Sequence, residues 1–353
     1  MERTPRFRAA HRAALDHTLE LIAESPWGRG LVLRGSITMA AWVGDKARPP
    51  ADLDWIVPDP TDIAFTDPAD PFPYVDGLSR VQHWPEAAFG AVTDEMWEDE
   101  QFESFGLRPI LPPEGLHWVD PDDYSENHTW TPLLDNLIET IRQRPAARAG
   151  VVLNADGIDD SADGSYALDY YDTPGLRVRV PWYTTGPDAM AGEVQLDFAA
   201  DQALPDSPVW TLVPRGDGSA PTPCVTASPE LSLAWKLLWL FTESTTTSEY
   251  VDIREGGAGK DLYDAVLLAE SPRIRLPRPL LRRALGTAAD DFEADDILTW
   301  NVHWDTFRQH HPDVTGSLRE WLERLVRGLT RARGQLSPRG EPRVSGSAGD
   351  QFG

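Results

Sequence analysis

The N-terminal region begins with a helical pattern that gives way to a strand-like one. Residues 8–23 place Leu15, Leu19 and Ile22 at helical intervals among arginine, histidine and glutamate side chains, which predicts an amphipathic helix. After a break that contains proline and glycine, residues 31–33 are uniformly apolar. That short apolar run predicts a buried strand directly after the helix.

A second helix and a second strand are expected next. Ser36 is a favourable N-cap residue, and the apolar residues behind it predict a helix that extends through Trp42. Gly44 and the prolines at 49–50 end that helix. Residues 52–57 alternate acidic with apolar side chains and then turn fully apolar, which predicts a strand.

The middle of the chain is less regular. Residues 59–132 are rich in Pro, Asp, Glu and Trp and show little periodicity. Because a structureless loop of that length is improbable inside a compact domain, we expect an elaborated insertion with short elements of its own. Beyond it, residues 133–144 predict a helix, and the alternating segments 176–180 and 193–198 predict strands.

The C-terminal part has a different character. A Pro- and Gly-rich link is expected around 204–223, and helical periodicity dominates after it. The predicted helices cover 229–243, 260–270, 279–286 and 315–333. We therefore predict an α/β core over 1–225, a helical domain over 226–333 and a disordered tail over 334–353.

The charge balance limits what the protein can bind. The chain has 57 acidic residues against 32 Lys and Arg, a net charge of −25. Such a surface repels polyanions, so general electrostatic binding to DNA, RNA or acidic membranes is disfavoured. Nucleotide chemistry would have to use metal ions or a local basic patch.

The single cysteine, Cys224, cannot form an intrachain disulfide, and no Cys/His cluster has zinc spacing. The N-terminus lacks the apolar core of a signal peptide. The most apolar stretch, 231–241, is too short to span a bilayer. We therefore expect a soluble, cytoplasmic protein without a membrane partner.

The first candidate site combines a turn with two carboxylates. Gly35 and Ser36 stand between a strand and a helix, where backbone N–H groups and a hydroxyl can bind phosphate oxygens. Asp52 and Asp54 are two positions apart on a strand, so both side chains leave the same face and can share a divalent metal ion. The alternative is a capped helix followed by a solvated strand edge.

A third carboxylate, Asp197, interrupts the apolar strand predicted at 193–198. A lone carboxylate inside such a strand is costly to bury unless it is paired, hydrogen-bonded or bound to metal. It can complete a metal site or accept a proton from an attacking hydroxyl. The alternative is an exposed residue on an edge strand.

Two further candidates lie on the predicted helices. Lys236 is in the middle of a helix that is apolar nearly all round, so its ammonium group needs a partner such as a phosphate, unless it extends to the surface. Lys260, Asp261 and Asp264 open the next helix, with the two carboxylates one turn apart on one face. Acidic residues in a first turn are also favoured by the helix dipole alone.

In this order, the motifs Gly35-Ser36, Asp52-x-Asp54, Lys236 and Lys260-Asp261-x-x-Asp264 resemble those of the nucleotidyltransferase AbiEii toxin family. Its members are the toxins of abortive-infection toxin–antitoxin pairs. Arg48 also matches the arginine near the Asp-Leu-Asp motif, although Pro-Pro-Ala replaces the usual serine-containing step. An arginine often found after the motif lysine has no counterpart, since residues 241–243 read Phe-Thr-Glu.

The resemblance implies a polymerase-β-like nucleotidyltransferase core, a small mixed sheet with helices, followed by a helical domain that carries the lysine and Lys-Asp-x-x-Asp motifs. It implies that Asp52 and Asp54 hold Mg²⁺ (or Mn²⁺), with Asp197 as the third carboxylate and metal ligand. It further implies that Lys236 and Asp261 are catalytic. The residues expected to bind substrate are Gly35, Ser36, Arg48, Lys260 and Asp264.

The implied reaction is attack by an acceptor hydroxyl on the α-phosphate of an NTP, with release of pyrophosphate. Some relatives modify the 3′ end of tRNA, and a cluster of arginines offers a local surface for RNA: Arg273, Arg275, Arg278, Arg282 and Arg283. A protein or a small molecule is the alternative acceptor, and an inactive nucleotide- or protein-binding module is the alternative to an enzyme. A cognate antitoxin is an expected partner; DNA is not.

Overall fold

The computed structural model describes residues 4–25, 27–57, 131–158, 165–168, 173–186, 188–199, 204–245, 257–289, 292 and 294–332. All but the last two residues of the insertion expected at 59–132, and the whole tail expected at 334–353, lie outside the described residues. The chain forms two compact units, Met1–Ser232 and Leu233–Gly353. The domain limits that we derived from the sequence stay a prediction.

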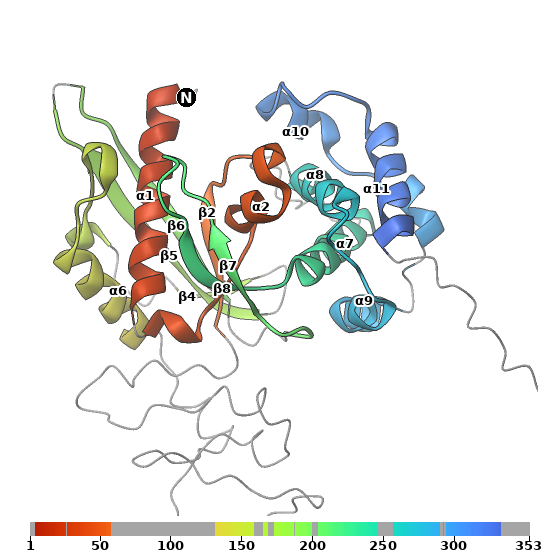
Figure 1. Ribbon diagram of the computed structural model, residues 1–353, viewed down its shortest axis with the longest axis horizontal. Helices are drawn as coiled ribbons and strands as arrows, with labels where there is room; N and C mark the ends of the chain where they lie inside the picture. Colours follow the sequence, from red (N-terminus) through yellow and green to blue (C-terminus); the bar gives the residue numbers. More distant parts are fainter. Residues whose placement is uncertain are drawn as a thin grey trace, which may run out of the picture. The chain divides into compact units, whose positions relative to one another are not determined.

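The first unit is built on a mixed β-sheet (Figure 1). Along the path of the described strands the order is β3-β5-β6-β2-β1-β8-β7, and β4 pairs with β5. β2 is parallel to β6 and β1 to β8, whereas the other described pairs are antiparallel. The strands are β1 (Val32–Arg34), β2 (Asp52–Ile56), β3 (Val151–Leu153), β4 (Ser165–Leu168), β5 (Thr173–Thr184), β6 (Ala191–Ala199), β7 (Val209–Val213) and β8 (Thr222–Thr226).

Two helices of this unit, α1 (Pro5–Glu24) and α6 (Thr131–Gln143), share one hydrophobic core with the sheet. The N-cap residue of α1 is Thr4, whose hydroxyl accepts a hydrogen bond from the Phe7 N–H group, and the first turn contains proline. Leu53 and Trp55 of β2 point into this core. Strand alternation therefore sends the intervening Asp52 and Asp54 to the opposite face of the sheet.

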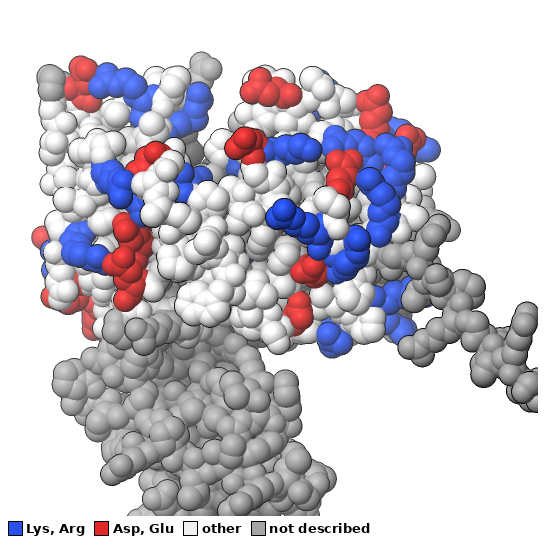
Figure 2. Space-filling view, in the orientation of Figure 1, with Lys and Arg blue, Asp and Glu red and all other residues white. Residues whose placement is uncertain are grey.

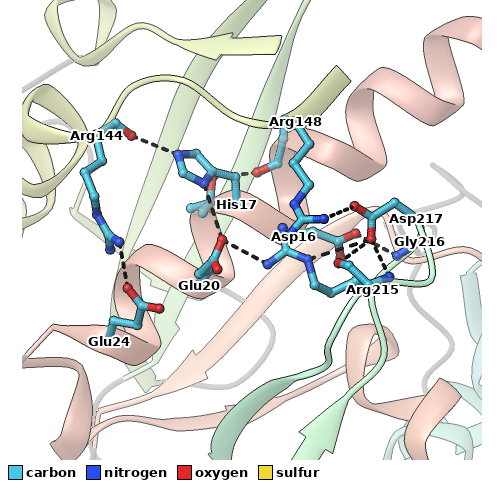
Figure 3. A network of polar contacts seen from close by, with 12 residues as sticks. Asp16, His17, Glu20, Glu24, Arg144, Arg148, Arg215, Gly216 and Asp217 are labelled. Carbon is cyan, nitrogen blue, oxygen red and sulfur yellow. Dashed lines mark hydrogen bonds and ion pairs between the residues drawn. The ribbon is translucent and has the colours of Figure 1, made fainter. Parts of the chain in front are cut away.

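A polar network fastens α1 to the loop between β7 and β8 (Figure 3). The buried carboxylate of Asp16 accepts hydrogen bonds from the Gly216 N–H group and from Arg12 Nε, each at 2.8 Å. Burial raises the pKa of Asp16, against the lowering effect of Arg12. The side chain of Arg215, also buried, pairs with Glu20 at 2.9 Å. These bonds hold the β7–β8 hairpin against the first helix.

The link predicted at 204–223 is wrong, because most of it forms the β7–β8 hairpin. Thr211 and Val213 are buried on one face of β7, and Trp210 and Leu212 are exposed on the other. This is the alternation of a half-buried strand. The prolines and glycines around it conceal the pattern in the sequence.

Helices make up the second unit, into which α7 (Pro229–Thr245) continues from the first. The others are α8 (Gly257–Glu270), α9 (Arg278–Leu285), α10 (Trp304–His310) and α11 (Leu318–Ala332). α8 and α11 pack closely where a Cβ atom on Gly328 would lie 2.8 Å from the Cβ atom of Ala269. The sequence pattern did not predict α10. Short 3₁₀ turns complete the described elements: Trp27–Gly30, Gly44–Lys46, Arg148–Gly150, Ala155–Gly157, Gly286–Ala289 and Ala294–Thr299.

The structure confirms the predicted fold class, a mixed α/β part followed by a helical part. The helices expected at 8–23, 133–144, 229–243 and 315–333 and the strands expected at 52–57, 176–180 and 193–198 are present, with ends that differ by a few residues. Among the described residues, no helix is long and apolar enough to cross a membrane.

Candidate active site

The sheet brings the predicted carboxylates of β2 and β6 to one face. Asp52 and Asp54 occupy alternating, half-buried positions of β2. In the parallel pairing with β6, Asp54 is in register with Asp197 and Asp52 with Gln195. Neighbouring strands are about 4.8 Å apart, so the carboxylates of Asp54 and Asp197 leave adjacent backbone positions on the same face.

Gly35 lies directly against this face. Its φ of 82° is in the region that favours glycine, and a Cβ atom there would lie 2.1 Å from Asp54 Oδ2. The Thr38 hydroxyl donates a hydrogen bond to the Gly35 carbonyl at 2.8 Å. Glycine is thus required twice at this position, by the backbone conformation and by the approach of the carboxylate.

The prediction that Ser36 caps the helix is wrong. Gly35 is the N-cap of α2 (Ser36–Val43) and Ser36 is its first helical residue, since the turn needs the positive φ of glycine one position earlier. The N-cap makes no side-chain hydrogen bond. Ser36 is 4% exposed, and its Oγ atom has no hydrogen-bond partner within the described part of the chain. A buried hydroxyl without a partner is uncommon and here marks a helix N-terminus.

Asp197 is held by two side chains that the sequence analysis did not single out. Arg177 Nε donates to Asp197 Oδ1 at 2.7 Å, and Gln195 Nε2 donates to Asp197 Oδ2 at 2.7 Å. Arg177 stands opposite Asp197 in the antiparallel pairing of β5 with β6. The alternation of residues 176–180 placed Arg177 on a polar face, but only the register of the two strands shows which carboxylate it meets.

In the second unit, Lys236 is buried between two carboxylates of its motif. Its Nζ atom lies 2.9 Å from Asp261 Oδ1 and 3.1 Å from Asp264 Oδ2. Asp264 is fully buried, and the ammonium group also lies 5.4 Å from the centre of the Trp239 ring. The partner that the sequence required for this lysine is therefore supplied within the protein.

Two other predicted residues are half-buried. Arg48 precedes β2 by four residues, and Lys260 stands on α8 one residue before Asp261. Their roles in substrate binding stay predictions. Cys224 is buried, which raises the pKa of its thiol to about 12, so this thiol is not a reactive nucleophile.

The oxygen ligands of Asp52 and Asp54 suit Mg²⁺, which binds one or two carboxylates and takes its remaining ligands from water and substrate phosphates. Among the described residues, no group of three or more His, Cys, Asp or Glu side chains is arranged to hold a metal ion. A pair of carboxylates on one face of β2 is nonetheless the donor set that such a nucleotide-bound ion uses.

Comparison with known proteins identifies a family. The family model described as nucleotidyl transferase AbiEii toxin, type IV toxin–antitoxin system, matches residues 122–335, well over half of the chain. No curated protein sequence matches significantly. Among solved structures, the chain is similar to MenT4, a nucleotidyltransferase toxin from Mycobacterium tuberculosis H37Rv, with 13% identity and a TM-score of 0.45, over 92% of this chain and 83% of that one.

Proposed function

Because this chain belongs to the nucleotidyl transferase AbiEii toxin family of type IV toxin–antitoxin systems, we propose that it transfers a nucleoside monophosphate from an NTP to an RNA hydroxyl, such as the 3′ end of a tRNA. The family makes it a nucleotidyltransferase toxin with an NTP substrate and an antitoxin partner. The divalent metal ion, the site residues and the acceptor belong to our proposal. The observation that carries it is the face of β2 beside Gly35.

Asp52 and Asp54 are the proposed ligands of Mg²⁺ (or Mn²⁺). They fit because both leave one face of β2 and offer hard oxygen atoms. A bound divalent ion would supply charge neutralisation at the phosphates of the NTP. Their position beside the N-terminus of α2 supports binding of a metal-coordinated triphosphate at this end of the sheet.

Gly35 and Ser36 are the proposed binding residues for the triphosphate. The first N–H groups of α2 and the Ser36 hydroxyl are donors, and phosphate oxygens accept from such donors. The buried Ser36 Oγ atom, which lacks a partner in the described part of the chain, supports this assignment. Arg48 and Lys260 are proposed to bind substrate through their positive charges.

Asp197 is the proposed third carboxylate, either as a metal ligand or as the acceptor of the hydroxyl proton. Its two carboxylate oxygens accept hydrogen bonds from Arg177 and Gln195. To bind a metal ion, Asp197 would have to give up at least one of these two hydrogen bonds. Arg177, with its guanidinium partly exposed on this face, is then able to bind a phosphate oxygen.

Lys236, Asp261 and Asp264 form the proposed catalytic cluster of the second unit. The ammonium group has three donors, and the two carboxylates account for two of them. In the reaction, the acceptor oxygen forms a bond to the α-phosphorus while the bond to the β-phosphate oxygen breaks. Pyrophosphate leaves with the electron pair, and the hydroxyl proton goes to a base. Catalysis rests on position and charge neutralisation.

An arginine surface supports RNA as the acceptor. We define it as the exposed arginines of residues 271–286 together with those at the end of α11: Arg273, Arg275, Arg278, Arg282, Arg283, Arg327 and Arg331. The Leu276 N–H group donates to the Ala332 carbonyl, which joins the two segments. Neither 271–286 nor 324–332 contains an acidic residue. Basic side chains also gather over α11 in Figure 2, and in a chain of charge −25 such a surface favours a polyanion.

Neutralising two residues of this arginine surface is expected to weaken RNA binding. Arg282→Gln with Arg283→Gln removes two exposed charges from α9, whose buried residues are Leu280, Leu281, Ala284 and Leu285. We expect a smaller slope of log affinity against log salt, by about 0.7 for each phosphate that is no longer neutralised, and weaker binding at low salt. Filter binding to total tRNA measures both. The control is Arg6→Gln with Arg8→Gln, two exposed arginines of α1; equal affinities for the two double variants would contradict an RNA surface on α9.

The acceptor is identified by label transfer. The purified protein is incubated with Mg²⁺, total cellular RNA and each α-labelled NTP in turn. Label in a tRNA-sized band supports the proposal and identifies the base. Label on protein or on a small molecule would show that this molecule, and not RNA, is the acceptor. Absence of label with every NTP and every acceptor would contradict the proposed reaction.

A further inference from the structure

Glu243, near the C-terminal end of α7, lies where three helices meet. Its side chain is 11% exposed. The Oε2 atom accepts a hydrogen bond at 3.0 Å from the N–H group of Ala258, the second residue of α8. The Oε1 atom lies 3.4 Å from Nδ1 of His303, the N-cap residue of α10. No motif in the sequence marks this glutamate or this histidine.

The contact with Ala258 caps α8 from another helix. The first N–H groups of a helix have no acceptor within it, and the first three residues of α8, Gly257–Gly259, carry no polar side chain. A carboxylate at a helix N-terminus is also favoured by the helix dipole. Glu243 therefore does for α8 what a serine or aspartate does at an ordinary N-cap.

The same residue determines how α8 is aligned with α7. Lys236, earlier on α7, contacts Asp261 and Asp264, whereas Glu243, later on α7, contacts Ala258. The two helices therefore run antiparallel and are joined at two points. Lys236 and Glu243 are two turns apart, about 10.5 Å along one face of α7. Two such contacts fix the axial position of α8, which one contact alone does not.

α10 is the third helix that meets α7 and α8 near Glu243. A Cβ atom on Gly259 would lie 2.5 Å from the Cβ atom of Phe307 and 3.3 Å from the His303 carbonyl oxygen, so α10 approaches the start of α8 closely. The His303 contact with Glu243 joins α10 to α7 at the same place. The Glu243 carboxylate on α7 therefore has one partner on α8, the Ala258 N–H group, and one at the start of α10, His303.

We propose that Glu243 is a positioning residue of the nucleotidyltransferase reaction, which holds Asp261 and Asp264 in place against Lys236, with His303 as its partner at the start of α10. The proposal rests on the function proposed above for the Lys236 cluster. In this role Glu243 acts through the alignment of α8. The alignment of these carboxylates with Lys236 matters because a misplacement of a catalytic group by about 1 Å can lower the rate on the order of 10²-fold.

A pH dependence is expected from the same geometry. Burial raises the pKa of Glu243, and the negative charge of Asp261 acts in the same direction, whereas His303 and the Ala258 N–H group lower it. Protonation therefore begins at a higher pH than in an ordinary glutamate, and the rate is expected to fall as the pH drops through this raised value. The free energy of unfolding is expected to depend on pH in the opposite direction from the rate. Because the folded state holds this proton more tightly than the unfolded one, the group's contribution to stability is lost as the pH rises.

The test compares Glu243→Ala with Glu243→Gln. Glutamine keeps an acceptor for the Ala258 N–H group, and alanine does not. We expect Glu243→Ala to lower kcat about tenfold or more with a KM for NTP within about threefold of the wild type, and Glu243→Gln to recover most of the rate at high pH without the acid limb of the profile. Glu230→Gln on the same helix is the control. The proposal would be overturned if Glu243→Ala and Glu243→Gln had equal rates. It would also be overturned if the pH–rate profile of Glu243→Gln kept the acid limb of the wild type.

Amide hydrogen exchange in α8 separates failure of this proposal from failure of the proposed function. Exchange in the first turn of α8 is expected to accelerate in Glu243→Ala and to stay slow in Glu243→Gln. If the wild type transfers no nucleotide, the function fails, whereas unchanged exchange in the alanine variant refutes the cap itself. His303→Asn gives a further measurement on a folded protein. It is expected to move the acid limb to higher pH, because a group that lowers the pKa of Glu243 is removed; no movement would refute the role of His303.

Discussion

Gly35→Ala is expected to abolish most nucleotide transfer. The added Cβ atom would lie 2.1 Å from Asp54 Oδ2, a distance at which one of the two atoms must move. The backbone of Gly35 is held between β1 and the start of α2, so the side chain of Asp54 is the part that gives way. A displacement on the order of 1 Å at a metal ligand is expected to lower the rate by at least about 10²-fold.

Gly44→Ala is the matched control. Gly44 follows the other end of α2 and also has a positive φ, of 63°, but apart from its chain neighbours no atom of the described residues lies within 4 Å of its added Cβ. Both variants strain the backbone by about 1–3 kcal/mol, because both positions have a positive φ that suits glycine. Only Gly35→Ala displaces the carboxylate. Transfer rates measured with labelled NTP on folded protein therefore isolate the collision, and equal rates for the two variants would show that Asp54 does not need its present position.

Lys236→Met is expected to destabilise the protein severely. The variant removes the partner of two carboxylates, of which Asp264 is fully buried. Removal of one partner from a buried ion pair costs about 3–5 kcal/mol, because the remaining charge keeps its desolvation penalty. Urea unfolding followed by tryptophan fluorescence measures the loss. Lys46→Met, at an exposed lysine, is expected to change the free energy of unfolding by less than about 0.5 kcal/mol.

A double variant distinguishes ion pairing from simple packing. Lys236→Met combined with Asp264→Asn removes one of the uncompensated charges, so it is expected to be more stable than Lys236→Met alone. The two substitutions should then be clearly non-additive in a double-mutant cycle. Additive losses would mean that Lys236 and Asp264 do not interact in the folded protein. Loss of transfer in Lys236→Met can be assigned to chemistry only after this stability effect is known.

The parts of the site that follow from short-range pattern could be predicted from the sequence. Alternation over 52–57 predicted the strand and placed Asp52 and Asp54 on one face, because side-chain direction in a strand depends only on its own residues. The spacing of Asp261 and Asp264 put both on one face of a helix for the same reason. The pattern also indicated that Lys236, inside an apolar helix, needs a partner unless it extends to the surface.

The partners themselves could not be predicted, because they depend on tertiary structure. Arg177 meets Asp197 through the register of β5 with β6, which no local pattern determines. His303 reaches Glu243 from 60 positions away along the chain. The helix start was misplaced at Ser36 because serine is a common N-cap, while the turn required the positive φ of Gly35.

The central claim, that the carboxylates of β2 carry out nucleotide transfer, is tested most directly by Asp54→Asn. Its transfer of label from NTP should be compared with that of the wild type and of Glu193→Gln, which removes an exposed carboxylate from β6. We predict a loss on the order of 10³-fold for Asp54→Asn, since a bound metal ion supplies several kcal/mol of transition-state stabilisation, and no loss for Glu193→Gln. Transfer by folded Asp54→Asn at the wild-type rate would contradict the account.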